Sequence, residues 1–154
     1  MRPTPRDQGM RWLEQAQADL KWVRHLAEEG AHYLVCFLAQ QAAEKGLKAI
    51  LYALGEEQVV GHSVRRLSQR VAEAGAVAAG DAAQVDRWGV LDSYYIPTRY
   101  PNGLPEDIPA RVYNREAAAS ALGLAEEVVG QVERWFGGTA PAEGDAAQDQ
   151  REQR

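Results

Sequence analysis

The fold of this chain is decided by residues 31–54, which have the sequence AHYLVCFLAQQAAEKGLKAILYAL. Apolar residues recur there at alternating spacings of three and four, the period of one helical face. That face consists of Cys36, Ala39, Ala43, Leu47, Ile50 and Leu54. Beside it runs a stripe of small residues that would let another helix approach closely, made of Ala39, Ala42, Gly46, Ala49 and Ala53. A helix that is apolar over most of its circumference is buried, so this segment is predicted to be the central helix.

The same period predicts four further helices outward from this segment, over about residues 6–29, 62–74, 85–95 and 114–136. Ser63 and Asn114 are residue types that cap helix N-termini. Prolines at 97, 101, 105 and 109 each remove an amide donor and disfavour helix in the preceding residue. Residues 96–113 are therefore predicted to be a loop, which is long for a connection between helices. The predicted class is all-α, with about five helices and a long proline-rich loop before the last.

Composition indicates one globular domain. The chain has 154 residues, of which 45% are hydrophobic and 25% charged, the ordinary globular mixture. We expect a helical domain over residues 7–136 and a disordered tail over 137–154, because the tail lacks apolar periodicity. The net charge of −5 opposes general coating of nucleic acid.

Cysteine usage and hydropathy favour a cytoplasmic location. Cys36 is the single cysteine, so no intrachain disulfide can form. The first ten residues lack the apolar core of a signal peptide, and no apolar run is long enough to span a membrane. We therefore expect a cytoplasmic protein without a membrane partner.

The first candidate site is a polar patch on the central helix. It consists of Gln40, Gln41, Glu44, Lys45 and Lys48. Helical geometry places Gln41 over Lys45 and Glu44 over Lys48. One interpretation is a solvated face on which these pairs contribute a few tenths of a kcal/mol each. The other is a patch shaped for a dimer contact or for an anion.

The second candidate site is the proline-rich insert, where aromatic and cationic side chains crowd together. The set comprises Tyr95, Arg99, Tyr100, Arg111, Tyr113 and Arg115. Arginine offers planar donors that match phosphate, and a tyrosine ring offers a face on which a base can stack, so a nucleotide pocket is one hypothesis. The alternative is that the tyrosines fasten the loop to the helices while the arginines cap helix ends.

Histidine is sparse, and no metal or other cofactor is expected. His25, His32 and His62 have no metal-ligand spacing with one another or with Cys36. No acid is placed to complete a triad with His62 and Ser63, and no glycine-rich phosphate loop precedes a helix. At the start of the third helix, His62 is more typical of a capping or packing residue than of a proton-transfer group, and it is a candidate ligand contact.

Two runs of sequence together resemble the HEPN family, the higher eukaryote and prokaryote nucleotide-binding domain. The first is Cys36-Phe37-Leu38-Ala39-Gln40-Gln41-Ala42-Ala43-Glu44-Lys45-Gly46-Leu47-Lys48-Ala49, and the second is Tyr94-Tyr95-Ile96-Pro97-Thr98-Arg99-Tyr100-Pro101. Ala18-Asp19-Leu20 and Gly61-His62-Ser63-Val64 add to the likeness, which spans roughly residues 7–136.

The resemblance implies an up-and-down helical bundle, a homodimer, association with a nucleotide or RNA, and pairing with a minimal nucleotidyltransferase in toxin and antitoxin systems. Family members that cut RNA carry an arginine followed a few residues later by a histidine. No arginine has that spacing before any histidine of this chain, so the ribonuclease role does not transfer residue by residue.

Three functional hypotheses follow. In the first, a non-nucleolytic protein binds a nucleotide or RNA-related ligand: Arg99, helped by Lys45 and Arg111, holds phosphate while Tyr95 or Tyr100 stacks on a base. The second is a metal-independent ribonuclease that uses arginine with His62 or a tyrosine. The third is a structural dimeric subunit that positions a nucleotidyltransferase and has no ligand site of its own.

Overall fold

The structure is a computed structural model that describes residues 2–76 and 82–138, and within these residues it contains helices and no strands. Its α-helices are α1 (Pro5–Glu28), α2 (His32–Ala53), α3 (Val64–Glu73), α4 (Ala82–Gly89), α5 (Pro109–Val112) and α6 (Arg115–Gly138). Two short 3-10 helices are η1 (Val90–Tyr94) and η2 (Pro101–Gly103). The predicted all-α class is confirmed.

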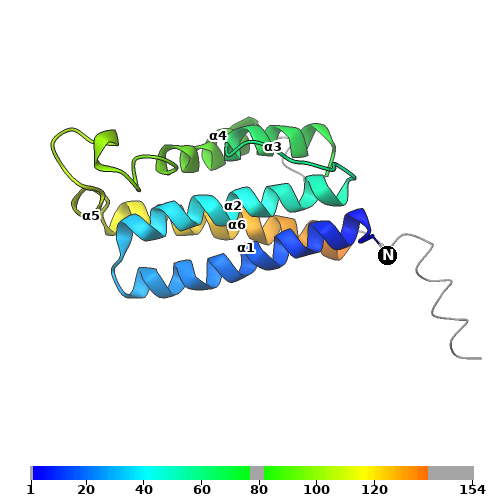
Figure 1. Cartoon of the computed structure of the whole chain (residues 1–154), viewed down its shortest axis with the longest axis horizontal. Helices are drawn as coiled ribbons and strands as arrows, with labels where there is room; N and C mark the ends of the chain where they lie inside the picture. Colours follow the sequence, from blue (N-terminus) through cyan, green and yellow to red (C-terminus); the bar gives the residue numbers. More distant parts are fainter. Residues whose placement is uncertain (1, 77–81, 139–154) are drawn as a thin grey trace, which may run out of the picture.

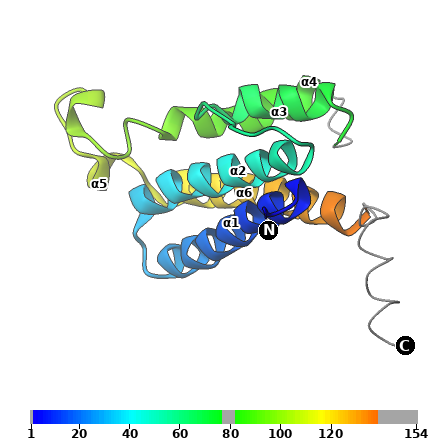
Figure 2. The same ribbon diagram turned by 45° about the vertical axis from the view of Figure 1, so that its right-hand side comes forward.

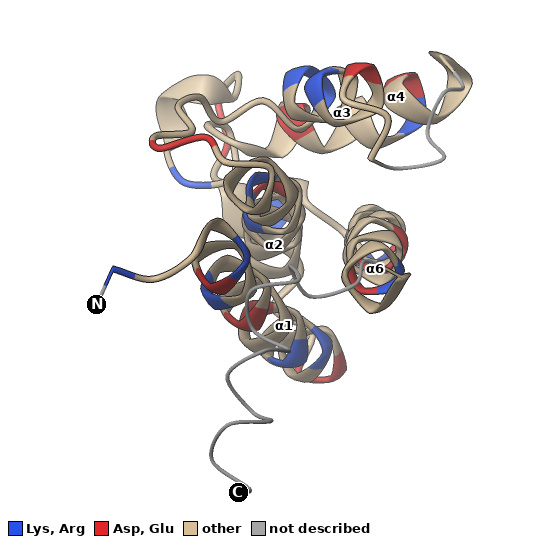
Figure 3. Ribbon diagram, turned by 90° about the vertical axis from the view of Figure 1, so that its right-hand side faces the viewer, with Lys and Arg blue, Asp and Glu red and all other residues tan. Residues whose placement is uncertain are grey.

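α2 is the central helix of the bundle, as its sequence predicts. α1, α2 and α6 lie side by side along the long axis, and α6 runs in the same direction as α2 (Figure 1). α3 and α4 cover another side of α2, which the end-on view of Figure 3 shows most clearly. α2 contacts α1, α3, α6, α5 and η1, so its apolar circumference is used within one chain.

The small residues of α2 pack inside this bundle. Ala39, Ala42, Gly46 and Ala49 are buried, and α1 and α6 are the helices that pack most extensively against α2. The predicted close approach therefore occurs between helices of the same chain, and the stripe does not provide a free surface for a second copy.

Local sequence signals set the ends of the helices. Thr4 Oγ1 accepts a hydrogen bond from the Asp7 amide at 3.1 Å, and Asp7 Oδ2 accepts one from the Thr4 amide at 3.0 Å, which forms a capping box. Hydrogen bonds from the side chain and the backbone of Thr4 to the Asp7 carboxyl lower the pKa of Asp7. Ser63 accepts from Arg66 N and Asn114 accepts from Ala117 N, so both predicted caps are confirmed.

The insert between η1 and α6 is less irregular than the prolines suggest. Pro101 and Pro109 are the first residues of η2 and α5, the helix position where a missing amide donor costs nothing. α4 ends at Gly89 and continues as η1 to Tyr94, so the fourth helix loosens before it reaches Pro97. Figure 2 shows the insert extending beyond the end of α2.

The last helix ends later than its sequence pattern predicts. α6 continues through Gly137 and Gly138, two residues that the sequence pattern assigns to the tail. The rest of that tail, residues 139–154, lies outside the described part of the chain. Over the described residues, no helix combines the length and the hydropathy needed to cross a bilayer.

Candidate functional site

Glu44 on α2 is the centre of a buried hydrogen-bond network. Its side chain is only 6% exposed. Its Oε1 lies 2.8 Å from His62 Nδ1 and 2.9 Å from Lys48 Nζ. Its Oε2 accepts from the side-chain amides of Gln41 at 3.2 Å and Gln40 at 3.4 Å. Four donors therefore surround one carboxylate, which compensates for its removal from water.

Gln40 fastens this network to the segment that precedes α3. Its side chain is fully buried, and its Nε2 donates to the backbone oxygen of His62 at 2.8 Å. Its Oε1 accepts from Gln41 at 2.7 Å. Both the backbone and the ring of His62 are thus held by α2, while 59% of the side chain stays exposed.

Burial of Glu44 and Lys48 excludes the interpretation of this part of α2 as a solvated face. Lys48 is 7% exposed, and its ammonium lies over the Trp12 ring at 5.7 Å from the ring centre. The predicted stacking of Glu44 over Lys48 is present, but as a buried ion pair. Removing one partner of such a pair costs about 3–5 kcal/mol, because the other charge remains buried and uncompensated.

Tyr95 joins His62 to the proline-rich insert. The two rings stack with centroids 4.9 Å apart and an interplanar angle of 19°. Tyr95 also lies under the Arg99 guanidinium, whose Cζ is 4.6 Å from the ring centre. The Nε of Arg99 donates to the Tyr95 backbone oxygen at 2.8 Å. One ring therefore supports both the imidazole and the guanidinium.

Arg99 is held by aromatic rings and a carbonyl rather than by a carboxylate. Its Cζ lies 4.9 Å from the Phe37 ring centre and 5.5 Å from that of Tyr100. Within residues 2–76 and 82–138, no acidic side chain forms an ion pair with Arg99. The aromatic rings position this cation, and no neighbouring carboxylate neutralises it. Such a guanidinium is suited to binding a phosphate or a carboxylate of a ligand.

Lys45 and Arg111 do not join this cluster through any contact with Arg99 or His62. Lys45 points toward α1, where its Nζ lies 2.5 Å from Asp19 Oδ2. Arg111 is paired with Asp107 at 3.3 Å within the insert. Of the six predicted ligand contacts, the structure brings together four, namely His62, Tyr95, Arg99 and Tyr100.

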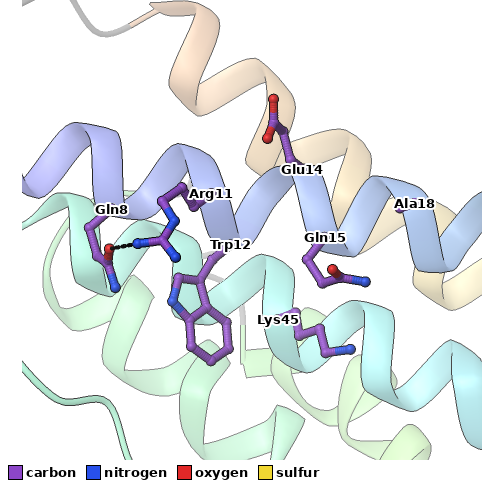
Figure 4. A pocket seen from close by; sticks show the side chains of 7 residues that line it. All are labelled: Gln8, Arg11, Trp12, Glu14, Gln15, Ala18 and Lys45. Carbon is purple, nitrogen blue, oxygen red and sulfur yellow. Dashed lines mark hydrogen bonds between the residues drawn. The ribbon is translucent and has the colours of Figure 1, made fainter. Parts of the chain in front are cut away.

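A separate groove lies between α1 and α2 (Figure 4). Its volume is about 870 Å³, and Arg11, Trp12 and Lys45 are among the residues that line it. The Arg11 guanidinium donates to Gln8 at 3.1 Å, and the Trp12 ring stacks with Tyr52, with centroids 5.0 Å apart. The groove is on the Lys45 side of α2, and none of its lining residues belongs to the cluster around His62 and Arg99.

Tyr94 and Tyr113 attach the insert to the helical core, which was the alternative role predicted for the tyrosines. Their rings meet edge to face with centroids 5.9 Å apart, and both pack against the hydrophobic core. Burial, and then the neighbouring Cys36, raise the pKa of both hydroxyls. Burial also raises the pKa of Cys36 to about 11, so this thiol is an inert core residue at neutral pH.

The role of Asp92, which links η1 to α3, is not predictable from the sequence. Its carboxylate accepts from Val64 N at 2.6 Å, Arg65 N at 3.3 Å and Ser63 Oγ at 2.7 Å. These bonds hold Ser63, the residue after His62, against η1, the 3-10 helix before Tyr95. The residues are separated by 27 or more positions along the chain, and no local pattern relates them.

The arrangement can bind an anion and accept a proton. The cluster offers the exposed Arg99 side chain, the exposed Tyr100 ring and the exposed imidazole of His62. Over the described ranges, no group of three or more histidine, cysteine, aspartate or glutamate side chains is assembled that could hold a metal ion. A guanidinium can bind phosphate, and an exposed tyrosine ring can stack on a base.

Comparisons with known proteins agree with this helical bundle and its helix order. The HEPN domain family model matches residues 10–135. TT1696 from Thermus thermophilus has a crystal structure that is similar to this one, with a TM-score of 0.75, 38% identity, and coverage of 83% of this chain and 98% of that one. The comparison with curated proteins gave no match.

Two further crystal structures are similar to this chain. ST0689, an archaeal HEPN homologue, has a TM-score of 0.67 with 29% identity, over 84% of this chain and 98% of its own. The HEPN domain protein TM0613 from Thermotoga maritima has a TM-score of 0.63 with 24% identity, over 84% and 99% of the two chains. At that identity the last likeness concerns the fold alone.

The fold and the family match define a helical-bundle protein of the nucleotide-binding and ribonuclease type. The chain belongs to the HEPN family. Its polar cluster differs from the arginine and histidine motif of the nucleolytic members, because Arg99 follows His62 in the sequence instead of preceding it.

Proposed function

We propose that this protein is a non-nucleolytic HEPN subunit that binds a nucleotide or an RNA-related ligand at the cluster around Arg99. In this proposal the phosphate lies on the Arg99 guanidinium, a base stacks on the exposed Tyr100 ring, and His62 contacts the ligand from the α2 side. Lys45 and Arg111 are not part of this contact set, since Asp19 and Asp107 neutralise them.

The observation that supports this function is the state of Arg99. Its guanidinium is positioned by three rings and one carbonyl oxygen, and it faces no carboxylate in the described part of the chain. Arg24, Arg70 and Arg87, by contrast, are each paired with a glutamate. A preorganised and unneutralised cation loses little freedom when it binds phosphate.

Calorimetric titration of ATP, ADP, AMP and a short single-stranded RNA tests this function. We expect at least one of them to bind, and Arg99→Ala to weaken that binding by about ten- to a hundredfold, the value of a charged hydrogen bond. Arg24→Ala is the control, because it removes an equally charged side chain from the α1 surface. Binding that is unaffected by Arg99→Ala, or no binding of any probe, would contradict the proposal.

A metal-independent ribonuclease is the second candidate, and the contact between His62 and Glu44 favours it. A buried carboxylate 2.8 Å from Nδ1 orients an exposed imidazole, which is an arrangement found in general acid and base catalysis. An assay with chelator present would compare the wild type with His62→Ala and Arg99→Ala. Cleavage by the wild type that both substitutions abolish would establish the nuclease. An inactive wild type would support the proposal of a non-nucleolytic binding subunit.

We further propose that the subunit acts as a homodimer beside a minimal nucleotidyltransferase, as a toxin or antitoxin partner. This part rests on family membership, since the small residues of α2 are used within the chain. Sedimentation equilibrium at micromolar concentration is expected to give twice the chain mass. A purely structural accessory protein would form the same dimer and co-purify with its partner, but it would bind none of the nucleotide probes.

A further inference from the structure

We infer that Glu44 is the positioning residue of the ligand site and that it makes His62 a fixed proton acceptor. The inference builds on the proposed ligand site, but it concerns the free protein first. It assigns a single imidazole tautomer, with the proton on Nδ1 and the lone pair on Nε2.

The tautomer follows from which atoms face each other. An ionised carboxylate is only an acceptor, and Glu44 is paired with the Lys48 ammonium at 2.9 Å on the same oxygen that faces His62. Nδ1 of His62, 2.8 Å from that oxygen, must therefore be the donor. In a neutral imidazole the other ring nitrogen then has the lone pair, so Nε2 is an acceptor.

The surroundings of His62 hold the ring in this orientation. Gln40 binds its backbone oxygen, Tyr95 stacks against one face, and Glu44 fixes one edge. The ring cannot turn over without losing the Glu44 bond, because Nδ1 and a carbon atom would exchange places. With the side chain 59% exposed, the fixed Nε2 is the ring atom available to a ligand.

This geometry specifies what the ligand must offer. A group that meets His62 Nε2 must donate a hydrogen bond, while a group that meets Arg99 must accept one. Both side chains lie against the ring of Tyr95, so the two requirements apply to one ligand site. The matching chemistry is a phosphate ester that also bears a hydroxyl or an N–H group.

Nitrogen-15 NMR of the histidine side chains in the free protein tests the role of Glu44. At about pH 8.5, where an imidazole is ordinarily neutral, we expect His62 to give the signature of one tautomer with an unprotonated Nε2. Glu44→Gln should convert this into a mixture, because an amide can either accept from Nδ1 or donate to it. A wild-type ring that already averages between tautomers, or an unchanged signature in Glu44→Gln, would overturn the inference.

A second variant controls for unfolding, because Glu44→Gln alone leaves the Lys48 ammonium buried without its partner. Glu44→Gln combined with Lys48→Met removes both charges, which proteins commonly tolerate better than a broken pair. The same loss of the single tautomer is expected there. A folded double variant that keeps the wild-type signature would show that Glu44 does not position the ring.

Titration of AMP separates this inference from the proposed function. His62→Gln retains an acceptor near the place of Nε2, whereas His62→Asn retains polar atoms only near Nδ1. We expect Asn to weaken AMP binding about tenfold and Gln to weaken it less, the range expected for one hydrogen bond. Equal loss in both variants would refute the donor requirement. Absence of AMP binding to the wild type would refute that requirement for this probe, and the nucleotide function is refuted only if ATP, ADP and the RNA also fail to bind. The NMR result decides the role of Glu44 in either case.

Discussion

At the scale of single residues, two glycines in helices have opposite surroundings. A Cβ at Gly9 of α1 would lie 2.5 Å from the Ala49 backbone oxygen and 2.8 Å from the Ala53 Cβ. A Cβ at Gly46 of α2 would lie 3.6 Å or more from its neighbours, Val132 and Val129. The close crossing of α1 and α2 therefore depends on Gly9, and Gly46 is not needed for close approach.

Gly9→Ala is expected to lower the free energy of unfolding by about 1–3 kcal/mol, because backbone atoms must move to admit the methyl group. Gly46→Ala is the matched substitution. It is expected to raise that free energy by up to about 1 kcal/mol, the gain in helix propensity. Urea unfolding followed by circular dichroism measures both, and a Gly9→Ala protein as stable as the wild type would contradict the crossing geometry.

At the scale of elements, the segment that bears Tyr95 is joined to the start of α3 by Asp92. The carboxylate of Asp92 accepts from the first two backbone amides of α3 and from the hydroxyl of its cap, Ser63. This is N-terminal capping by a residue from a different element. It also fixes the distance between His62 and Tyr95, on which the ligand site depends.

Asp92→Ala is expected to destabilise the protein by about 1–2 kcal/mol, the upper part of the range for a lost helix cap. Asp86→Ala is the control: its carboxylate pairs with Arg65 on the surface, and such pairs contribute about 0.2–1 kcal/mol. Thermal unfolding of both variants gives the comparison. Equal effects of the two substitutions would show that the carboxylate of Asp92 acts only as a surface charge.

At the scale of the whole molecule, the pH dependence of stability is set in part by ionisable groups whose pKa is raised by burial in the core. The core includes Cys36 and is packed by Tyr94 and Tyr113. All three have a raised pKa in the folded state, with burial as the largest cause. Each therefore favours unfolding when the solution becomes alkaline, because the unfolded chain loses its protons first.

The direction of this pH dependence can be stated for Cys36. Its folded pKa is about 11 against an ordinary value of 9.0, so its contribution is complete below pH 9 and is lost as the pH rises toward 11. The loss is on the order of 3 kcal/mol at most. Urea unfolding between pH 8 and about 11 measures the slope. In Cys36→Ala the slope should be shallower, and an identical slope would contradict this assignment.

Much of the fold follows from local sequence. The three-and-four period of α2 predicts a central helix, and α2 is that helix. Ser63 and Asn114 predict helix starts because their side chains bond to amides three residues away. Such interactions involve residues close in sequence, so they can be inferred without knowing the tertiary structure.

The candidate site was only partly predictable, as Glu44 and Lys45 illustrate. They are adjacent in sequence, but on a helix they point in directions about 100° apart. Which neighbour each meets depends on the packing of distant elements: Glu44 meets His62, whereas Lys45 meets Asp19 on α1. The sequence predicted both as polar and could not assign them to different sides of α2.

The helical class, the central position of α2 and the aromatic and cationic character of the insert follow from the amino-acid sequence, because periodicity, caps and composition act over a few residues. The clustering of His62, Tyr95 and Arg99, and the buried carboxylate that orients the imidazole, emerge only when the helices pack. So does the use of the small residues of α2 in the chain's own core. The physical reason is that ion pairs, ring stacking and close helix crossings join residues far apart in the chain, and their partners are set by the packing of the whole bundle.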